Sequence, residues 1–112
     1  MKMVQAIIRH EKLGDVKAAL SDIGVIGLNV TEIQGRGVQK GATRQWRGAV
    51  YDVDLLPKIK LETVVDDPLV DKAVDAIQKA AFTGNIGDGK IFVWTVDQVV
   101  RVRTNERGKE AI

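Results

Sequence analysis

The 112-residue sequence predicts an α+β fold, a split βαβ sandwich in which two helices cover one face of an antiparallel sheet. Twice along the chain the period of the apolar residues changes from two to between three and four and back again. The length suits one domain, because independent cores usually need on the order of 100 to 150 residues. No linker rich in Ser or Pro divides the chain.

The first part of the chain predicts a strand, a helix and a second strand. Apolar residues alternate from Met3 to Arg9, which is typical of a strand. From Lys12 to Ile23 the apolar residues recur every three or four positions, which predicts an amphipathic helix closed by Gly24. The stretch from Leu28 to Gln34 is rich in β-branched residues between two glycines and predicts the second strand.

The later part of the chain predicts a third strand, a second helix and a fourth strand. Apolar and charged residues alternate over residues 58–65, which predicts the third strand. Asp67 and Pro68 supply an N-cap and a first-turn proline for a helix whose apolar stripe runs from Val70 to Ala81. Ile91 to Val96 predicts the fourth strand.

The crossover rule fixes the order of these strands. Right-handed crossovers place the first and third strands at the centre of the sheet. One face of the sheet then carries no helix, and Ile7 and Val64 make this face partly apolar. We therefore expect copies of the chain to associate through it.

The composition excludes several classes of function. The chain has no cysteine, so disulfides, thiolate metal sites and a cysteine nucleophile are excluded. Its 17 Lys+Arg and 15 Asp+Glu are too balanced for a general nucleic-acid binder. The apolar runs fall far short of the roughly 18 residues of a membrane span, and no signal peptide is indicated, so we expect a soluble, cytoplasmic protein.

A segment from about Val38 to Asp52 has neither a helical nor a strand pattern. Structureless connections longer than about 12 to 15 residues are uncommon unless they have a function. The ring of Trp46 gains by docking on a partner, and Arg47 beside it can reach carboxylates or carbonyls. The segment predicts a partner-binding loop, with a solvated connection as the alternative.

Two motifs are compatible with anion binding. The run from Gly87 to Lys90 can aim consecutive backbone N–H groups into one concavity beside a lysine, although an ordinary turn is the alternative. We expect Val99 to Arg103 to be extended, so that Arg101 and Arg103 project to the same side and suit a polyphosphate. A solvated charged edge is the alternative there.

Five stretches, which together span the chain, resemble the nitrogen-regulatory PII signal proteins of the GlnB and GlnK type: AIIRHEKLGDVKAAL, GRGVQKG, WRGAVYDVDLLPKIKLETVV, TGNIGDGKIFVW and VRVRTNERGKEAI. The resemblance implies a ferredoxin-like βαββαβ sandwich that forms a homotrimer. It also implies that ATP or ADP binds in clefts between subunits, and that 2-oxoglutarate is sensed together with Mg²⁺ and ATP. Within one PII-like domain, 1–112, the T-loop would span about 37–55, the B-loop about 82–90 and the C-loop about 102–109.

The resemblance also assigns the nucleotide-binding residues. Gly87, Asp88, Gly89 and Lys90 would hold the phosphates from one subunit, and Arg101 and Arg103 would reach in from its neighbour. Ile7 and Val64 would line the adenine pocket. The set also includes Asn29, which replaces a threonine near the base, with Gly35, Gly37 and Val38. Val38 stands where many relatives have a phosphate-contacting arginine, and Arg36 is close enough in sequence to compensate.

The second ligand would bind at the base of the T-loop. The side chain of Gln39 would place its amide oxygen on Mg²⁺, which 2-oxoglutarate chelates. Lys58 would pair with the distal carboxylate, and backbone N–H groups of Gln39, Lys40 and Gly41 would complete the site. Binding of the acid would then reshape the loop.

The resemblance implies a protein partner for the T-loop. Arg47 matches a loop-tip arginine that enters an ammonium channel in GlnK-type proteins, and Arg44 and Trp46 would join it. Tyr51 matches a uridylylated tyrosine, although the more basic loop departs from the usual pattern. An ammonium transporter is the preferred partner, with membrane association only through it. The alternative is a nitrogen-assimilation enzyme such as glutamine synthetase, or its modifying enzymes.

Two other classes of function share this order of elements. RNA-recognition modules need stacking rings on the two central strands, which the first and third strands lack, so we expect no nucleic-acid partner. A phosphatase needs a positioned nucleophile or general base, and none is evident. The single histidine, His10, has no Ser or Cys partner pattern. We expect no enzyme, with slow ATP hydrolysis at most.

Overall fold

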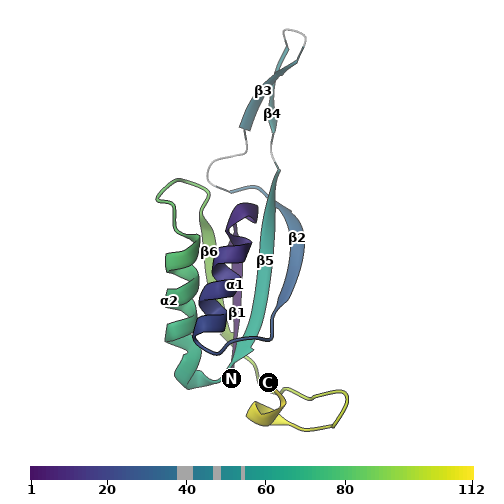
Figure 1. The fold of residues 1–112 in the computed structure, drawn as a ribbon. Coiled ribbons are helices and arrows are strands. Elements are labelled where there is room, and N and C mark those ends of the chain that lie inside the picture. The colour runs from purple at the N-terminus through teal and green to yellow at the C-terminus, as the bar shows by residue number, and fades with distance from the viewer. Residues whose placement is uncertain (38–41, 47–48, 54) are drawn as a thin grey trace.

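A computed structural model of the chain describes residues 1–37, 42–46, 49–53 and 55–112. Four strands form one antiparallel sheet in the order β2-β5-β1-β6 (Figure 1). The central strands are β1 (Lys2–Ile8) and β5 (Leu56–Val65), and the edge strands are β2 (Asn29–Gly35) and β6 (Gly89–Thr95). This arrangement confirms the α+β, ferredoxin-like βαββαβ fold and the central position of the first and third predicted strands.

Two helices, α1 (Leu13–Asp22) and α2 (Val70–Ala81), lie side by side on one face of the sheet (Figure 1). The buried apolar side chains lie between the helices and the sheet: Val4, Ala6, Ile8, Val16, Leu20, Val25, Ile59, Leu61, Val65, Ala73, Ile77 and Ala81. Apart from Val25, which lies in the loop after α1, they come from alternate positions of β1 and β5 and from one stripe of each helix, as the apolar pattern predicts. In the part of the chain that the structure describes, neither helix has the length and apolar character of a membrane span.

The structure corrects the start of the second helix. The N-cap is Asp66 rather than Asp67, because the Asp66 carboxylate accepts a hydrogen bond from the backbone N–H of Asp67 at 3.0 Å. A 3₁₀ turn (Asp67–Leu69) with Pro68 in its first positions then leads into α2. Asp66 has the extended backbone that an N-cap needs, and Asp67 already belongs to the turn.

The long connection contains two strands that its pattern did not predict. β3 (Ala42–Trp46) and β4 (Ala49–Val53) pair antiparallel in a separate two-stranded sheet, from Ala42 opposite Val53 to Trp46 opposite Ala49. The prediction that this stretch has no regular structure is therefore wrong for these ten positions. Backbone pairing between two strands needs no buried face, so the apolar alternation that marks a packed strand is missing here.

The prediction that the chain is extended from Val99 to Arg103 is also wrong. Val100 forms an isolated bridge with Arg107, and residues 102–104 form a turn. The backbone N–H of Asn105, at φ 60°, donates to the carbonyl of Arg101 at 2.8 Å, which closes the turn. Because the chain turns back here, Arg101 and Arg103 do not lie on one face of a strand.

Candidate functional site

A pocket of about 360 Å³, the B-loop pocket, lies between the B-loop and the adjoining ends of β1, β2 and β5. It brings together a large share of the predicted site residues: Ile7, Gly35, Gly37, Lys58, Gly87, Asp88, Gly89 and Lys90. Arg36 also lines it, as do three residues that sequence analysis did not assign: Leu56, Asn85 and Phe92. Side chains far apart in the sequence therefore meet at one end of the sheet.

The carboxylate of Asp88 organises the B-loop. One oxygen accepts from the backbone N–H groups of Thr83 at 2.8 Å and Gly84 at 2.9 Å. The other accepts from the Thr83 hydroxyl and from Nε of Arg9, the latter at 3.1 Å. The hydrogen bond from the Thr83 hydroxyl, followed by the backbone bond from Thr83, holds the pKa of Asp88 well below its usual range. The carboxylate is therefore anionic, and its acceptors are used by the loop and by Arg9.

Glycines allow the loop to close around this carboxylate. Gly84, Gly87 and Gly89 have φ angles of +88°, +102° and +111°, which other residues rarely adopt. A Cβ on Gly89 would lie 1.7 Å from the carbonyl oxygen of Ile7, so only glycine fits at this approach to β1. In the described part of the chain the backbone N–H of Gly87 has no acceptor, whereas residues 86 and 87 form a turn that directs the N–H of Asp88 toward the carbonyl of Asn85. An unpaired N–H group beside a pocket is suited to an anion.

Two cationic side chains also line the B-loop pocket. Nζ of Lys58 donates to the carbonyl of Gly87 at 2.6 Å, and Lys58 forms no ion pair with another described residue. Burial, and after it the charge of Arg9, lowers the pKa of Lys58. Lys90 lies at the start of β6 with an exposed side chain. A carboxylate or a phosphate entering the pocket would meet positive groups on two sides.

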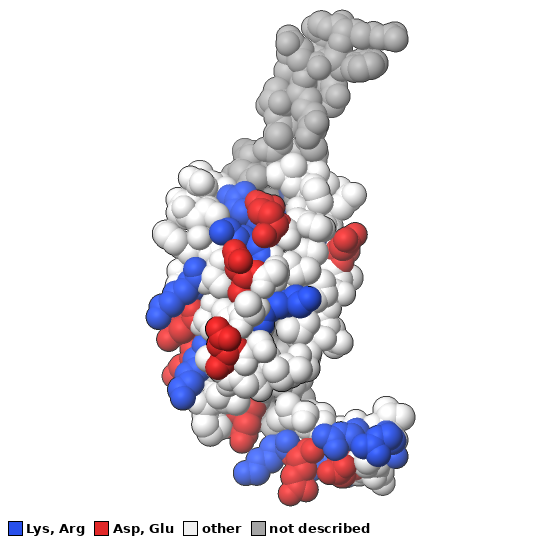
Figure 2. Space-filling model, in the orientation of Figure 1, with Lys and Arg blue, Asp and Glu red and all other residues white. Residues whose placement is uncertain are grey.

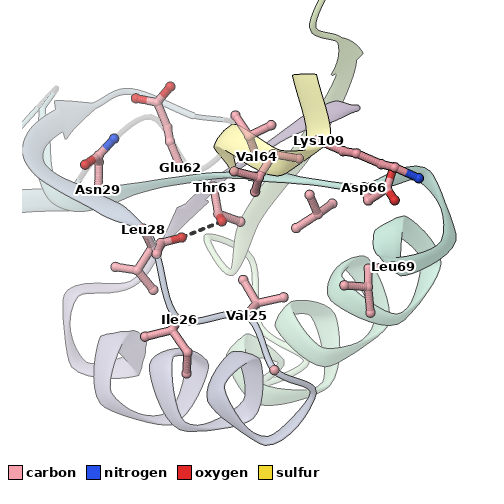
Figure 3. A pocket seen from close by; sticks show the side chains of 14 residues that line it. Val25, Ile26, Leu28, Asn29, Glu62, Thr63, Val64, Asp66, Leu69 and Lys109 are labelled. Atoms are coloured by element: carbon pink, nitrogen blue, oxygen red, sulfur yellow. Dashed lines mark hydrogen bonds between the residues drawn. The ribbon is translucent and has the colours of Figure 1, made fainter. Parts of the chain in front are cut away.

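A second pocket of about 710 Å³, the C-terminal pocket, lies at the other end of β5 (Figure 3). Asn29, Val64 and Lys109 contribute to its lining, together with the loop that follows α1. The Thr63 hydroxyl donates to the carbonyl of Gly27 at 2.6 Å and fixes this loop against β5 (Figure 3). The pocket thus combines apolar walls with the polar side chains of Asn29 and Lys109.

The two predicted adenine residues lie in different pockets of one chain. Val64 lies opposite Met3 in the sheet register, so Ile7 is four residues further along β1, a separation of about 13 Å. Ile7 lines the B-loop pocket and Val64 the C-terminal pocket. A single cleft that uses both residues therefore needs a second copy of the chain.

The two predicted arginines of the C-loop lie at the end of the sheet opposite the B-loop (Figure 1). The guanidinium of Arg101 donates to the carboxylate of Glu106 at 2.8 Å and to the carbonyl of Glu110 at 3.1 Å. A hydrogen bond from Thr104, followed by the charge of Arg101, lowers the pKa of Glu106. Arg103 is exposed and has no hydrogen bond in the described part of the chain. Lys and Arg side chains gather on this segment beside acidic ones (Figure 2).

Several predicted site residues fall outside the described residues: Val38, Gln39, Lys40, Gly41 and Arg47. For Arg44, Trp46 and Tyr51 the structure describes the backbone in β3 and β4. The described residues contain no cluster of three His, Asp or Glu side chains that could hold a metal ion. The Mg²⁺ ligand expected at Gln39 therefore stays a prediction.

Sequence analysis missed the residues that hold the B-loop, Arg9 and Thr83. Thr83 precedes Gly84 at the end of the second helix and suggested only a helix terminus. Arg9 is 79 positions from Asp88, and the pairing of β1 with β6 brings them together. No local signal in the sequence marks this contact.

Comparisons with known proteins agree with the fold. The sequence model of the family described as Nitrogen regulatory protein P-II matches residues 1–106. Over all 112 residues of both chains, the sequence is 56% identical to a "Nitrogen regulatory protein P-II" of Azospirillum brasilense and 55% identical to one of Rhodospirillum rubrum. It is also 56% identical to "Nitrogen regulatory protein P-II 2" of Methanothermobacter thermautotrophicus, over the whole of this chain and 97% of that protein.

The resemblance seen in the sequence is thereby confirmed over the full length of the chain. The chain belongs to the nitrogen regulatory P-II protein family.

Proposed function

We propose that this nitrogen regulator is a homotrimer that binds ATP or ADP and, together with Mg²⁺ and ATP, 2-oxoglutarate. Its T-loop would carry the signal to an ammonium transporter. The observation that carries the proposal is the B-loop, where Gly87, whose N–H has no acceptor among the described residues, lines one pocket with Lys90 and Lys58. Such a concavity suits the phosphates of a nucleotide.

The face of the sheet without helices supports the trimer. The register places Val64, Met3 and Trp94 in one row of this face, and Glu62, Gln5 and Phe92 in the next. Phe92 and Trp94 are each 44% exposed, so two aromatic side chains are open to a second copy. Light scattering at micromolar concentration tests this association, and a monomer there would contradict it.

Association would also complete the nucleotide site. In one chain Ile7 and the B-loop residues line the B-loop pocket, Asn29 and Val64 line the C-terminal pocket at the opposite end of the sheet, and Arg101 and Arg103 line neither. A neighbouring copy would bring Asn29, Val64, Arg101 and Arg103 to the B-loop and Ile7 of the first. Arg103 is exposed in the described structure and is available for a phosphate.

Lys58 is the described residue that supports the 2-oxoglutarate site. It is half-buried in the B-loop pocket, and among the described residues its hydrogen-bond partner is the Gly87 carbonyl and no carboxylate forms an ion pair with it. A carboxylate of the acid would pair with it, and Gln39, Lys40 and Gly41 would supply the remaining contacts. When bound, Mg²⁺ would link the acid to the nucleotide phosphates.

Calorimetry with ADP, with ATP, and with 2-oxoglutarate in the presence of Mg²⁺ and ATP tests these ligands. Lys58→Met should weaken binding of 2-oxoglutarate by about tenfold to a hundredfold, the loss of one charge-assisted hydrogen bond. Lys60→Met is the matched control, because Lys60 lies two residues further along β5 and pairs with Glu62. Equal affinities of the two variants for the acid would contradict the role of Lys58.

The T-loop is the proposed contact with the partner, through Arg44, Trp46 and Arg47, with Tyr51 as a possible modification site. The separate sheet of β3 and β4 supports this, because it provides two further strands that are not part of the helix-covered sheet. An ammonium transporter in membranes should be retained on the immobilised protein and released by 2-oxoglutarate with Mg²⁺ and ATP. Retention of glutamine synthetase or its modifying enzymes instead would favour the alternative target.

A further inference from the structure

The carboxylate of Asp88 is engaged with its own loop and with β1. Its two oxygens accept four hydrogen bonds, two from backbone N–H groups, one from the Thr83 hydroxyl and one from Arg9. A carboxylate has room for about four such bonds. The acceptor positions of Asp88 are therefore filled, and an ionised carboxylate has no hydrogen to donate to an anionic ligand.

Arg9 extends the same network to a second point of the loop. Its Nε donates to Asp88 at 3.1 Å, and its Nη2 donates to the carbonyl of Ile86 at 2.8 Å. Arg9 directly follows β1, so this guanidinium fastens the middle of the loop to a central strand of the sheet. The side chains of Arg9 and Asp88 are 22% and 23% exposed, which limits their competition with water.

The fastened loop has a defined shape. The Thr83 hydroxyl also accepts from the N–H of Asn85 at 3.2 Å, so the N–H groups of residues 83–85 are all used. The N–H of Gly87 has no acceptor in the described part of the chain, and Gly87 lines the B-loop pocket. The network therefore uses the N–H groups of residues 83–85 and leaves that of Gly87.

We propose that Asp88, Arg9 and Thr83 are positioning residues for the phosphates of the nucleotide: they hold the B-loop in the shape that presents the Gly87 N–H group, and the Asp88 carboxylate itself does not contact the phosphate. This inference rests on the proposed nucleotide binding. It separates the Asp88 side chain, which holds the loop, from the groups of residues 87–90 that the resemblance assigns to the phosphates.

The direction in which Asp88→Asn changes nucleotide affinity tests the proposal. If the carboxylate acted only as a negative charge near the phosphates, Asp88→Asn would strengthen nucleotide binding by removing repulsion. If it holds the loop, Asp88→Asn weakens binding, because the amide keeps one oxygen and turns its NH₂ group toward a donor. The two accounts predict opposite changes.

The experiment measures ADP affinity by calorimetry without Mg²⁺, and amide hydrogen exchange of residues 82–90 in the nucleotide-free protein. Asp88→Asn and Thr83→Val should each weaken ADP binding by about tenfold or more and speed exchange at residues 83 and 84, because each loses a charge-assisted bond. Thr83→Ser keeps the hydroxyl and should restore both values. Asp75→Asn, the same change on the exposed side of α2, is the control.

Tighter or unchanged ADP binding by Asp88→Asn would overturn the proposal, as would failure of Thr83→Ser to differ from Thr83→Val. If the unmodified protein binds no ADP, the proposed function fails. The exchange rates then decide whether Asp88 holds the loop, so the two failures are distinguishable.

Discussion

Replacing Gly89 by alanine tests how closely the B-loop approaches the central strand β1. Gly89 has a φ of +111°, and an added Cβ would lie 1.7 Å from the oxygen and 2.8 Å from the carbon of the Ile7 carbonyl. It would also lie 3.3 Å from Cα of Ile8. All three atoms belong to the backbone of a strand that is paired on both sides, so none can rotate away as a side-chain tip would.

The cost of this substitution has two parts. A positive φ costs a residue with a Cβ about 1 to 2 kcal/mol. Relief of the overlap requires β6 to move away from β1 near the pairs Ile7 with Lys90 and Ile8 with Gly89. Such a movement loses roughly two backbone hydrogen bonds at about 1 kcal/mol each. The free energy of unfolding should therefore fall by about 3 to 4 kcal/mol.

Two other glycines separate these parts. Gly24 has a φ of +88° with no atom within 4 Å of an added Cβ, so Gly24→Ala should cost only the backbone strain, about 1 to 2 kcal/mol. Gly14 lies in α1 with equally open space, and Gly14→Ala should stabilise by about 0.5 to 1 kcal/mol through helix propensity. Urea titrations at one fixed protomer concentration measure all three. If Gly89→Ala costs no more than Gly24→Ala, the close approach of the B-loop to β1 does not exist.

Three further predictions concern separate parts of the molecule. The lowered pKa of Asp88 means that its contribution to stability is complete above its ordinary pKa of 3.8 and is lost as the pH falls toward the folded-state value. Urea titrations from pH 3 to 7 should therefore show a smaller acid loss in Asp88→Asn, and equal slopes would contradict this. Thr63 is 4% exposed and donates to Gly27, so Thr63→Val should cost about 1 kcal/mol in the same assay, whereas the exposed Thr31→Val should cost little. Trp94→Glu should dissociate the proposed trimer in light scattering because it places a charge in the apolar row of the helix-free face, and an unchanged mass would show that copies associate elsewhere.

The sequence predicted the elements that have one buried face. β5 alternates strictly between buried and half-buried side chains from Lys58 to Val65, and α2 buries Ala73, Ile77 and Ala81 along one stripe. Burial of one face imposes the spacing of the apolar residues, so this spacing can be recognised in the sequence. β3 and β4 pair through their backbones without such a pattern, and the C-terminal turn is set by positive φ at Asn105 and by hydrogen bonds rather than by burial.

The residues of the candidate site could be predicted only where they stand together in a local sequence motif. The glycines of the B-loop and Lys90 stand together in the sequence, and the positive φ of Gly87 and Gly89 is what such a motif anticipates. The contact of Arg9 with Asp88 spans 79 positions and depends on the register between β1 and β6. Lys58 approaches Gly87 across 29 positions for the same kind of reason. Pairings of this range follow from the assembled sheet and not from local pattern.

The B-loop is thus fastened to both central strands, by Arg9 after β1 and by Lys58 in β5, and the two fastenings differ in what a ligand can do to them. Arg9 holds an anion that belongs to the loop, so a second carboxylate gains little there. Lys58 holds only the carbonyl of Gly87, which a carboxylate can replace because a charged acceptor binds an ammonium more strongly than a neutral one. Since the Gly87 carbonyl and the Gly87 N–H belong to one residue, loss of the Lys58 contact frees the backbone of Gly87, which carries the donor proposed for the phosphates. An acid that recruits Lys58 must therefore alter nucleotide affinity, and linkage requires the nucleotide to alter acid affinity by the same factor.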